Sequence, residues 1–204
     1  ARNGFVLQDP DSQIVTDKVW HELAFGLESL GVDNTTIRGR VAEMASFFGI
    51  QTWFHKSVDQ LSGGQKQLLN LASIMVLQPD VLILDEPTSQ LDPIAATDFL
   101  QTLGRINREL GTTILICEHR LEDVIPMANR LLILDHGVLI ADNPPVETFE
   151  ILRNRKHPML HAMPTPMRIW STLNWNTPCP MTVSDGRNQL TQWAECNSLT
   201  QTPE

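Results

Sequence analysis

Apolar residues in the first quarter of the chain recur at the spacing of amphipathic helices. Intervals of three or four positions place side chains on one face of a helix, and Gly31 separates two such stretches. The two faces are Val19, Leu23, Leu27 and Leu30 for the first helix, and Ile37, Val41, Met44 and Phe48 for the second. The pattern therefore predicts a small helical layer near the start of the chain.

Further along, continuous apolar runs that are typical of buried strands alternate with helical periodicity. Strands are predicted at GFVLQ (4–8), VLILD (81–85) and TTILIC (112–117), and helices at about 64–77 and around Phe99, Leu103, Ile106 and Leu110. Strands that are apolar at every position and separated by helices indicate a parallel sheet covered on both faces. The predicted fold class is therefore α/β, with a parallel sheet and a small helical subdomain.

The last third of the chain changes character. The segment RLLILDHGVLIAD, residues 130–142, predicts a hairpin that turns at His136-Gly137. Beyond about residue 155 the periodicity is lost, and proline, asparagine and threonine become frequent. We expect these residues to form a linker or a poorly packed arm, in which Trp170, Trp175 and Trp193 either cover the flank of the domain or lack order.

Charge and cysteine content restrict the classes of protein that are compatible with this sequence. The formal net charge is -9 and the basic residues are scattered, which argues against an electrostatic nucleic-acid binder. The three cysteines are far apart and lack metal-ligand spacing, so they suit a reducing compartment. No apolar run approaches the roughly 20 residues of a membrane-spanning helix, and we expect a protein that is soluble or peripheral to a membrane.

Two consecutive carboxylates follow the predicted strand VLILD. Ligand sites of open parallel sheets lie just past the carboxyl ends of the strands, so Asp85 and Glu86 occupy a suitable place for chemistry. Neighbours on a strand point to opposite faces, and both can serve one site only if the strand ends between them. Pro87 favours such an end and is expected to hold Glu86 extended. Asp85 would then hold Mg²⁺ and Glu86 would polarise a water; the alternative is a pair of solvated carboxylates.

The stretch LSGGQKQ, residues 61–67, has the composition of a phosphate-binding turn. Gly63 and Gly64 allow close approach of the backbone, and the amides at the start of the following helix favour an anion. Ser62 adds a hydroxyl. The alternative is an ordinary helix cap made by the Ser62 side chain.

Four motifs occur in a fixed order: LSGGQ (61–65), the strand with Asp85-Glu86-Pro87, SQLD (89–92), and CEHR (117–120) after the next strand. This constellation resembles the ATP-binding cassette (ABC) ATPases over approximately residues 4–145. The resemblance implies a P-loop NTPase-like ABC ATPase fold. It also implies that ATP and Mg²⁺ are bound, and that a second ABC cassette pairs with this one.

The resemblance gives each matching residue an expected role. Gln8 matches the Q-loop glutamine, which contacts magnesium and water and senses the partner subunit, and His119 matches the switch histidine, which contacts the terminal phosphate. The expected catalytic residues are Glu86, His119 and Gln8; the expected ATP-binding residues are Ser62, Gly63, Gly64, Gln65, Asp85 and Asp92; the expected Mg²⁺ ligands are Asp85 and Gln8. For His119 and Gln8 taken singly, a polar surface residue is the alternative reading.

The phosphate loop of the family, G-x-x-x-x-G-K-[ST], does not occur in these 204 residues. In the family it precedes the Q-loop by several tens of residues, so we expect the chain to be a fragment lacking that N-terminal part and inactive alone. A naturally degenerate cassette is the alternative. The expected domains are an incomplete ATP-binding domain at 1–155, with a helical subdomain at 12–60 and a catalytic part at 61–155. A linker or C-terminal extension at 156–204 follows, and it resembles the connector between two fused cassettes.

The interval between Gln8 and Leu61 holds two short helices, which resembles transporters rather than chromosome or repair enzymes. The stretch at 7–32, with ELAFGLE, resembles the ATPases of energy-coupling factor importers of vitamins and transition metals. This implies a transmembrane coupling subunit, docked beside Gln8 and residues 12–30, and a peripheral place on the cytoplasmic face of the membrane. Trp20, Phe25 and Leu27 serve that docking or belong to the core. The alternatives are a soluble ABC ATPase of repair or translation and a non-catalytic half-cassette.

Overall fold

The computed structural model describes residues 2–173 and 177–196, which form two compact units. The first unit ends at His119 and the second begins at Arg120. Trp175, for which the sequence leaves two alternatives, lies outside the described residues. Among the described residues, no helix combines the length and the apolar character needed to cross a membrane.

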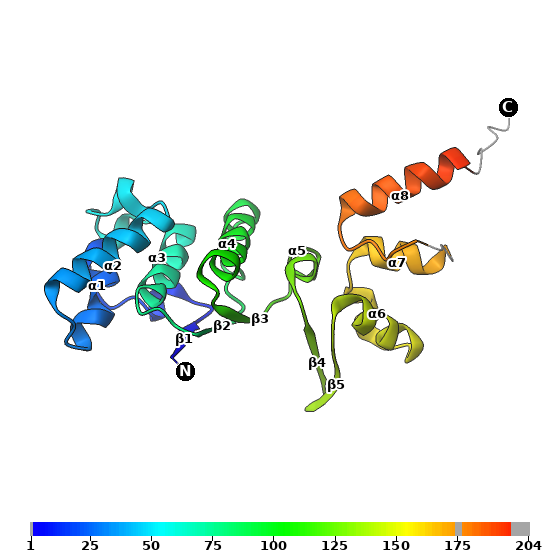
Figure 1. Cartoon of the computed structure of the whole chain (residues 1–204), viewed down its shortest axis with the longest axis horizontal. Coiled ribbons are helices and arrows are strands. Elements are labelled where there is room, and N and C mark those ends of the chain that lie inside the picture. Colours follow the sequence, from blue (N-terminus) through cyan, green and yellow to red (C-terminus); the bar gives the residue numbers. More distant parts are fainter. Residues whose placement is uncertain (1, 174–176, 197–204) are drawn as a thin grey trace. The chain divides into compact units, whose positions relative to one another are not determined.

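The first unit contains a parallel sheet of three strands (Figure 1). The strands lie in the order β1 (Asn3–Val6), β2 (Val81–Asp85) and β3 (Thr113–Cys117). Phe5 lies beside Ile83, which lies beside Leu115. The α/β class with a parallel sheet, predicted from the apolar runs, is confirmed.

Helices occupy the stretches between the strands. They are α1 (Val19–Ser29), α2 (Asn34–Phe47), α3 (Gly63–Met75) and α4 (Pro93–Arg105), with short 3-10 turns at Pro10–Ser12, Ile50–Trp53 and Val58–Gln60 and a wider π-helical turn at Ile106–Leu110. The predicted apolar faces are buried, except that Leu30 and Leu110 are exposed. Leu30 lies past the last residue of α1, where Gly31 turns the chain with φ of 69°.

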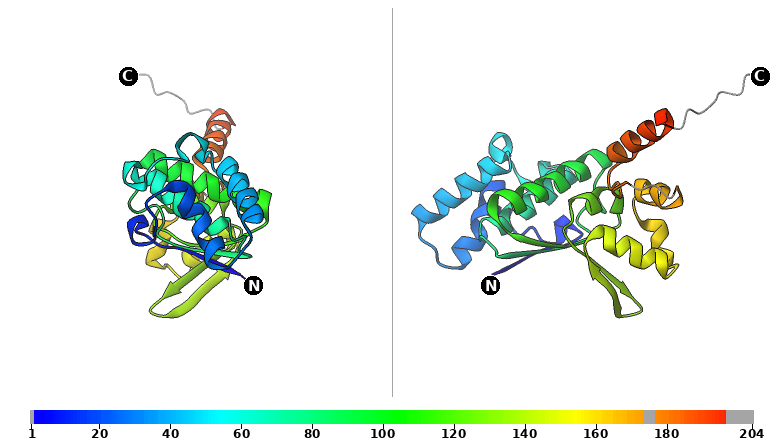
Figure 2. Two further views of the ribbon diagram at one scale, coloured as in Figure 1. Left: turned by 90° about the vertical axis from the view of Figure 1, so that its left-hand side faces the viewer. Right: turned by 45° about the vertical axis from the view of Figure 1, so that its right-hand side comes forward.

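Only one face of the described sheet is covered. The helices of this unit lie on one side of the strands (Figure 2), and Phe5 and Leu115 on the other side remain 48% and 47% exposed. The prediction that both faces are covered is therefore wrong for the described residues. Handedness explains this, because two right-handed crossovers that advance in the same direction, β1 to β2 and β2 to β3, place their helices on the same face.

The second unit is built on an antiparallel hairpin. Strands β4 (Leu131–Asp135) and β5 (Val138–Asn143) pair across His136 and Gly137, as predicted. Both turn residues have positive φ, 46° and 78°, which is the requirement of the tight hairpin turn that matches the twist of the strands. A short helix, α5 (Leu121–Val124), and a 3-10 turn at Ile125–Met127 precede the hairpin.

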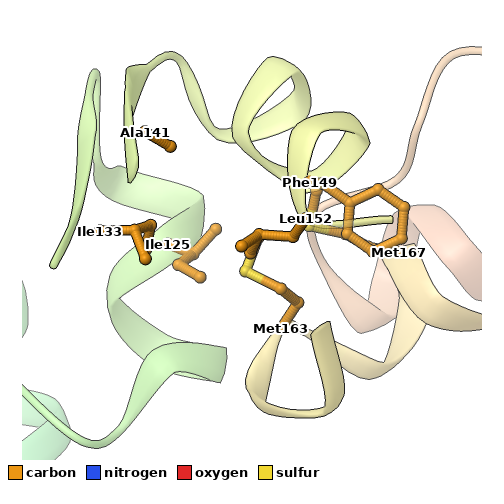
Figure 3. Close-up of a cluster of buried hydrophobic side chains, with 7 residues drawn as sticks. All are labelled: Ile125, Ile133, Ala141, Phe149, Leu152, Met163 and Met167. Atoms are coloured by element: carbon orange, nitrogen blue, oxygen red, sulfur yellow. The ribbon is translucent and has the colours of Figure 1, made fainter. Parts of the chain in front are cut away.

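Helices continue beyond the hairpin to residue 196. They are α6 (Pro145–Asn154), a 3-10 turn at Pro158–Ala162, α7 (Thr165–Thr172) and α8 (Val183–Cys196). A core joins α6 and α7 to the hairpin (Figure 3), and its members are Ile125, Ile133, Ala141, Phe149, Leu152, Met163 and Met167. Because Met163 and Met167 are almost fully buried, the stretch 158–172 is not the poorly packed arm that its composition suggests. A domain boundary near residue 155 stays a prediction.

Candidate functional site

The carboxyl ends of the three parallel strands meet at one edge of the sheet. Gln8 follows β1, Asp85 ends β2 with Glu86 directly after it, and His119 follows β3. The side chains of Gln8 and Asp85 are exposed at this edge, and that of Glu86 is half-buried. The sheet thus brings together the strand-end residues expected from sequence.

Glu86 stands at a sharp change in backbone direction. Strand β2 ends at Asp85, as the joint use of both carboxylates requires. Glu86 has φ of 44°, a left-handed conformation that is uncommon for a residue with a side chain. Its amide donates to the Cys117 carbonyl at 2.9 Å, and its carbonyl accepts from the Ser89 amide at 3.2 Å and hydroxyl at 2.9 Å. The prediction that Glu86 is extended before Pro87 is therefore wrong, because these bonds hold it in the turn.

Glu86 and His119 form a direct side-chain pair. Nε2 of His119 lies 2.9 Å from Oε1 of Glu86, a hydrogen-bond distance. The Glu86 side chain is 29% exposed and the His119 side chain 81% exposed, so a ligand has access to the pair. A carboxylate fixed by an imidazole at a strand edge is suited to accept a proton from water.

A second glutamate, which sequence reasoning missed, holds the segments that carry this pair. Oε1 of Glu118 accepts from the amide of Thr88 at 3.1 Å and from its hydroxyl, and Oε2 accepts from the amide of His119 at 2.6 Å. Thr88 is buried. In the sequence, Glu118 is recognisable only as a carboxylate next to His119 in CEHR. The sequence does not show which loop this side chain contacts.

Gln67 was missed as well. It is fully buried on α3, and its side-chain amide donates to the carbonyls of Leu7 at 3.2 Å and Pro87 at 3.0 Å. Leu7 precedes Gln8 and Pro87 follows Glu86, so one amide group ties together the ends of β1 and β2. Gln67 therefore fixes the relative position of the loops that carry the two candidate residues.

Helix α3 begins with a complete capping box. The Ser62 hydroxyl accepts from the Gln65 amide at 3.3 Å, and the Gln65 side chain accepts from the Ser62 amide at 3.0 Å. The capping alternative for Ser62 is therefore confirmed. Within the described residues, the amides of Gly63 and Gly64 have no hydrogen-bond acceptor. They lie at the positive end of a 13-residue helix. Capping and anion binding by this turn are therefore compatible.

Asp92 caps the next helix. Its side chain accepts from the amides of Ile94 and Ala95, both at 3.0 Å, at the start of α4. The start of α3 lies close by, since a Cβ added to Gly64 would lie 3.0 Å from the Cβ of Ala95. Gly64 thus permits the close approach of the two helices, whereas a Cβ on Gly63 would meet open space.

The predicted residues fall into two groups. One group surrounds the strand ends and contains Gln8, Asp85, Glu86 and His119, and the other surrounds the start of α3 and contains Ser62, Gly63, Gly64 and Gln65. Within 2–173 and 177–196, no hydrogen bond joins a member of one group to a member of the other.

Cys117 lies within the acidic edge. Partial burial raises the pKa of its thiol, and the charges of Asp85, Glu86 and Glu118 raise it further. The thiol is therefore a poor nucleophile at neutral pH, and no role in the chemistry of the site is assigned to it.

The residues present fit a nucleotide with Mg²⁺. The amides of Gly63 and Gly64 lie at the start of a helix, where an anion is favoured. A Cβ added to Gly63 would meet open space, which leaves room for a phosphate. In the described part of the chain, no group of three or more His, Cys, Asp or Glu side chains could hold a metal ion alone. The oxygens of Asp85 and Gln8 nevertheless suit Mg²⁺, which takes one or two protein ligands and completes its shell with phosphates and water.

Comparison with protein families identifies residues 2–89 as a match to the ABC transporter family model. Those residues run from β1 through the start of the turn after Glu86. The match thus covers a little less than half of the chain.

Two relatives carry the name of an ABC transporter ATP-binding protein. One, from Bacillus thuringiensis subsp. konkukian, is 45% identical over 196 residues, which are 94% of this chain and 34% of the relative. Another, from Bacillus cereus, is 54% identical over 142 residues, which are 70% of this chain and 26% of the relative. The chain thus spans about a third of the length of the first relative and about a quarter of the length of the second.

A solved structure shares the fold. CbiO1 from Clostridium perfringens, which is described as part of the ABC transporter complex CbiONQ, superposes with a TM-score of 0.68 at 32% sequence identity. The superposition covers 78% of this chain and 65% of CbiO1. The chain therefore has the α/β fold of an ABC ATPase with its parallel sheet.

Proposed function

We propose that this chain is part of the ATP-hydrolysing subunit of an ABC transporter, with Glu86 as the general base. The observation that carries the proposal is the Glu86–His119 pair at the carboxyl edge of a parallel sheet, 2.9 Å apart and open to solvent. The match of residues 2–89 to the ABC transporter family supports it.

In the proposed reaction, water attacks the terminal phosphorus of ATP, the bond from that phosphorus to the bridging oxygen breaks, and ADP and inorganic phosphate leave. With Nε2 protonated, the His119 imidazole donates to Oε1 of Glu86 and orients the carboxylate, whose other oxygen accepts the proton of the attacking water. Asp85 and Gln8 would hold Mg²⁺, which when bound neutralises charge on the phosphates. The protein's own contribution is positioning and charge stabilisation.

The start of α3 acts on a different ATP molecule in this proposal. Amides of Gly63 and Gly64, with the Ser62 hydroxyl, would donate to the terminal phosphate of ATP held by the phosphate loop of a second cassette. That arrangement is supported by the two separate groups of candidate residues. It would couple nucleotide occupancy to closure of the cassette pair.

We further propose an importer of the energy-coupling factor type, for vitamins or transition-metal ions. The similarity to CbiO1 and the stretches ELAFGLE (22–28) and CEHRLEDV (117–124) support this. Trp20 and Phe25 are 42% and 37% exposed on α1, while Leu27 is buried, so the two aromatic rings are available to a helix of a transmembrane subunit. The protein would then lie on the cytoplasmic face of the membrane.

The direct test is steady-state ATP hydrolysis by the full-length protein with Glu86→Gln. The amide keeps the size of the side chain but cannot take up a proton, so we expect the rate to fall by roughly 10²–10⁴, about 3–5 kcal/mol of barrier. Glu109→Gln, which removes an exposed carboxylate that pairs with Arg105 on the same helix, is the control and should leave the rate unchanged. A loss of less than a fewfold in Glu86→Gln would exclude Glu86 as the base.

A further inference from the structure

The geometry points to Glu118 and Thr88 as a positioning pair, and we propose that they set the separation of Glu86 and His119. This inference rests on the proposed ATP hydrolysis. Glu118 does not itself contact the reacting groups. Its carboxylate binds backbone and side-chain donors of the two segments that carry them.

On one side, Glu118 fixes the turn that follows Glu86. Thr88 is 1% exposed and donates both its amide and its hydroxyl to Oε1 of Glu118. Two further bonds close the same turn, from the Ser89 amide to the Glu86 carbonyl at 3.2 Å and from the Leu91 amide to the Thr88 carbonyl at 3.0 Å. A movement of Thr88 would therefore be transmitted to the backbone of Glu86.

On the other side, Glu118 fixes the backbone of His119. Its second oxygen accepts from the His119 amide at 2.6 Å. The imidazole itself is largely exposed and contacts Glu86 at its tip, so its place depends on the backbone that carries it. Hydrogen bonds to a carboxylate are about twice as strong as neutral ones. The two bonds that Thr88 donates are part-buried.

The left-handed backbone of Glu86 makes such a support necessary. For a non-glycine residue this conformation is strained, and it persists only where its surroundings hold it. Glu118 holds it through Thr88, while the bond from the Glu86 amide to the Cys117 carbonyl holds it from β3. The residue just before His119 is therefore part of the catalytic geometry although it touches no substrate.

The test is the kinetics of Thr88→Val and Thr88→Ser in the full-length protein. Valine keeps the shape of threonine and removes the hydroxyl, so we expect kcat for ATP hydrolysis to fall about tenfold, which corresponds to about 1.4 kcal/mol. The KM for ATP should stay within about twofold, because no ATP contact is lost. Serine restores the hydroxyl and should return kcat to within about twofold of the wild type.

The chain offers a matched control in its second unit. Thr165 donates its amide at 2.9 Å and its hydroxyl at 2.6 Å to Oε1 of Glu122, the same arrangement between two residues that belong to neither group of candidate residues. Thr165→Val should leave kcat unchanged. Equal kcat in Thr88→Val and the wild type, or a Thr88→Ser variant no more active than Thr88→Val, would overturn the proposal.

A readout that needs no ATP hydrolysis separates this inference from the proposed function. In Glu118→Ala, the amides of Thr88 and His119 lose their acceptor, and their hydrogen exchange should accelerate at least about tenfold, while the Thr165 amide is unaffected. Unchanged exchange at Thr88 and His119 would show that Glu118 does not hold them. A wild-type protein that hydrolyses no ATP would instead refute the proposed function, and the positioning role with it.

Discussion

At the scale of single residues, the candidate chemistry depends on the backbone conformation of Glu86 as well as on its side chain. The motif with Asp85 and Glu86 could be found from sequence, and so could the end of the strand between them. The left-handed φ of 44° could not, because the residue before a proline is ordinarily extended. Contacts with residues some 30 positions away, such as Cys117, decide that conformation.

Ser62 and Asp92 show that one side chain can be interpreted both as a nucleotide contact and as a helix cap. Both belong to motifs that the sequence assigns to nucleotide binding, and both cap a helix in the structure. Helix capping was predicted as an alternative role for Ser62 but not for Asp92. Capping is decided by backbone geometry at the helix start, which a residue type favours but does not fix.

For Asp92 we expect a measurable contribution to stability. Asp92→Ala removes the acceptor of the Ile94 and Ala95 amides and should lower the free energy of unfolding by about 1 kcal/mol, whereas Asp92→Asn should retain most of it. Urea unfolding measures both. Asp98→Ala on the exposed side of α4 controls for loss of a carboxylate, and equal stability of Asp92→Ala and Asp92→Asn would argue against the cap.

At the scale of elements, the strands and the hairpin were largely predictable, since short apolar runs and the His136-Gly137 turn carry local signals. The helices at 158–172 were not. Met159, Met163 and Met167 recur every four residues, but Pro164 and Pro166 interrupt the stretch. Met163 and Met167 become part of a core only beside Phe149 and Leu152 of α6 (Figure 3), a contact that the local sequence does not reveal.

The hairpin contains an ion pair whose effect should depend on pH. Nη2 of Arg130 lies 2.6 Å from Oδ2 of Asp142, and the Arg130 Nε also donates to this carboxylate. The hydrogen bond from Arg130 lowers the pKa of Asp142 below its ordinary value. The pair therefore stabilises the fold above the unfolded-state pKa, and the contribution is lost as the pH falls through the lower folded-state pKa.

We expect Asp142→Asn to lower the melting temperature at neutral pH. The difference from the wild type should shrink as the pH falls below about 4, because the wild-type carboxylate becomes protonated there. Thermal unfolding between pH 7 and pH 2 measures it. Arg130→Gln should show the same convergence, and a difference independent of pH would mean that the charge of Asp142 does not contribute.

At the scale of the whole molecule, the two separate groups of candidate residues are the reason for the proposal that a second cassette pairs with this one. The group at the strand ends contains the proposed base, Glu86. The group at the start of α3 contains the amides of Gly63 and Gly64, which have no acceptor among the described residues. The chain spans about a third of the length of the first relative and about a quarter of the length of the second, so the proposed pocket is tested in the full-length protein. Sequence motifs predicted both groups. The positioning contacts of Glu118, Thr88 and Gln67 could be identified only in the folded chain.

The claim that the start of α3 contacts nucleotide has a direct test in the chain's own glycines. A Cβ on Gly63 meets no protein atom within 4 Å, and the same holds for Gly39 inside α2. Each Gly→Ala change should therefore keep or raise the melting temperature, since alanine favours a helix by roughly 1 kcal/mol over glycine. In the proposed arrangement, however, a methyl group on Gly63 would stand where a phosphate approaches the amides.

The decisive measurement is steady-state ATP hydrolysis by the full-length protein carrying Gly63→Ala, beside Gly39→Ala. The account predicts a loss of at least about tenfold for Gly63→Ala with an unchanged or higher melting temperature, and wild-type activity for Gly39→Ala. Wild-type activity in Gly63→Ala would contradict it, because the start of α3 would then lie away from the nucleotide.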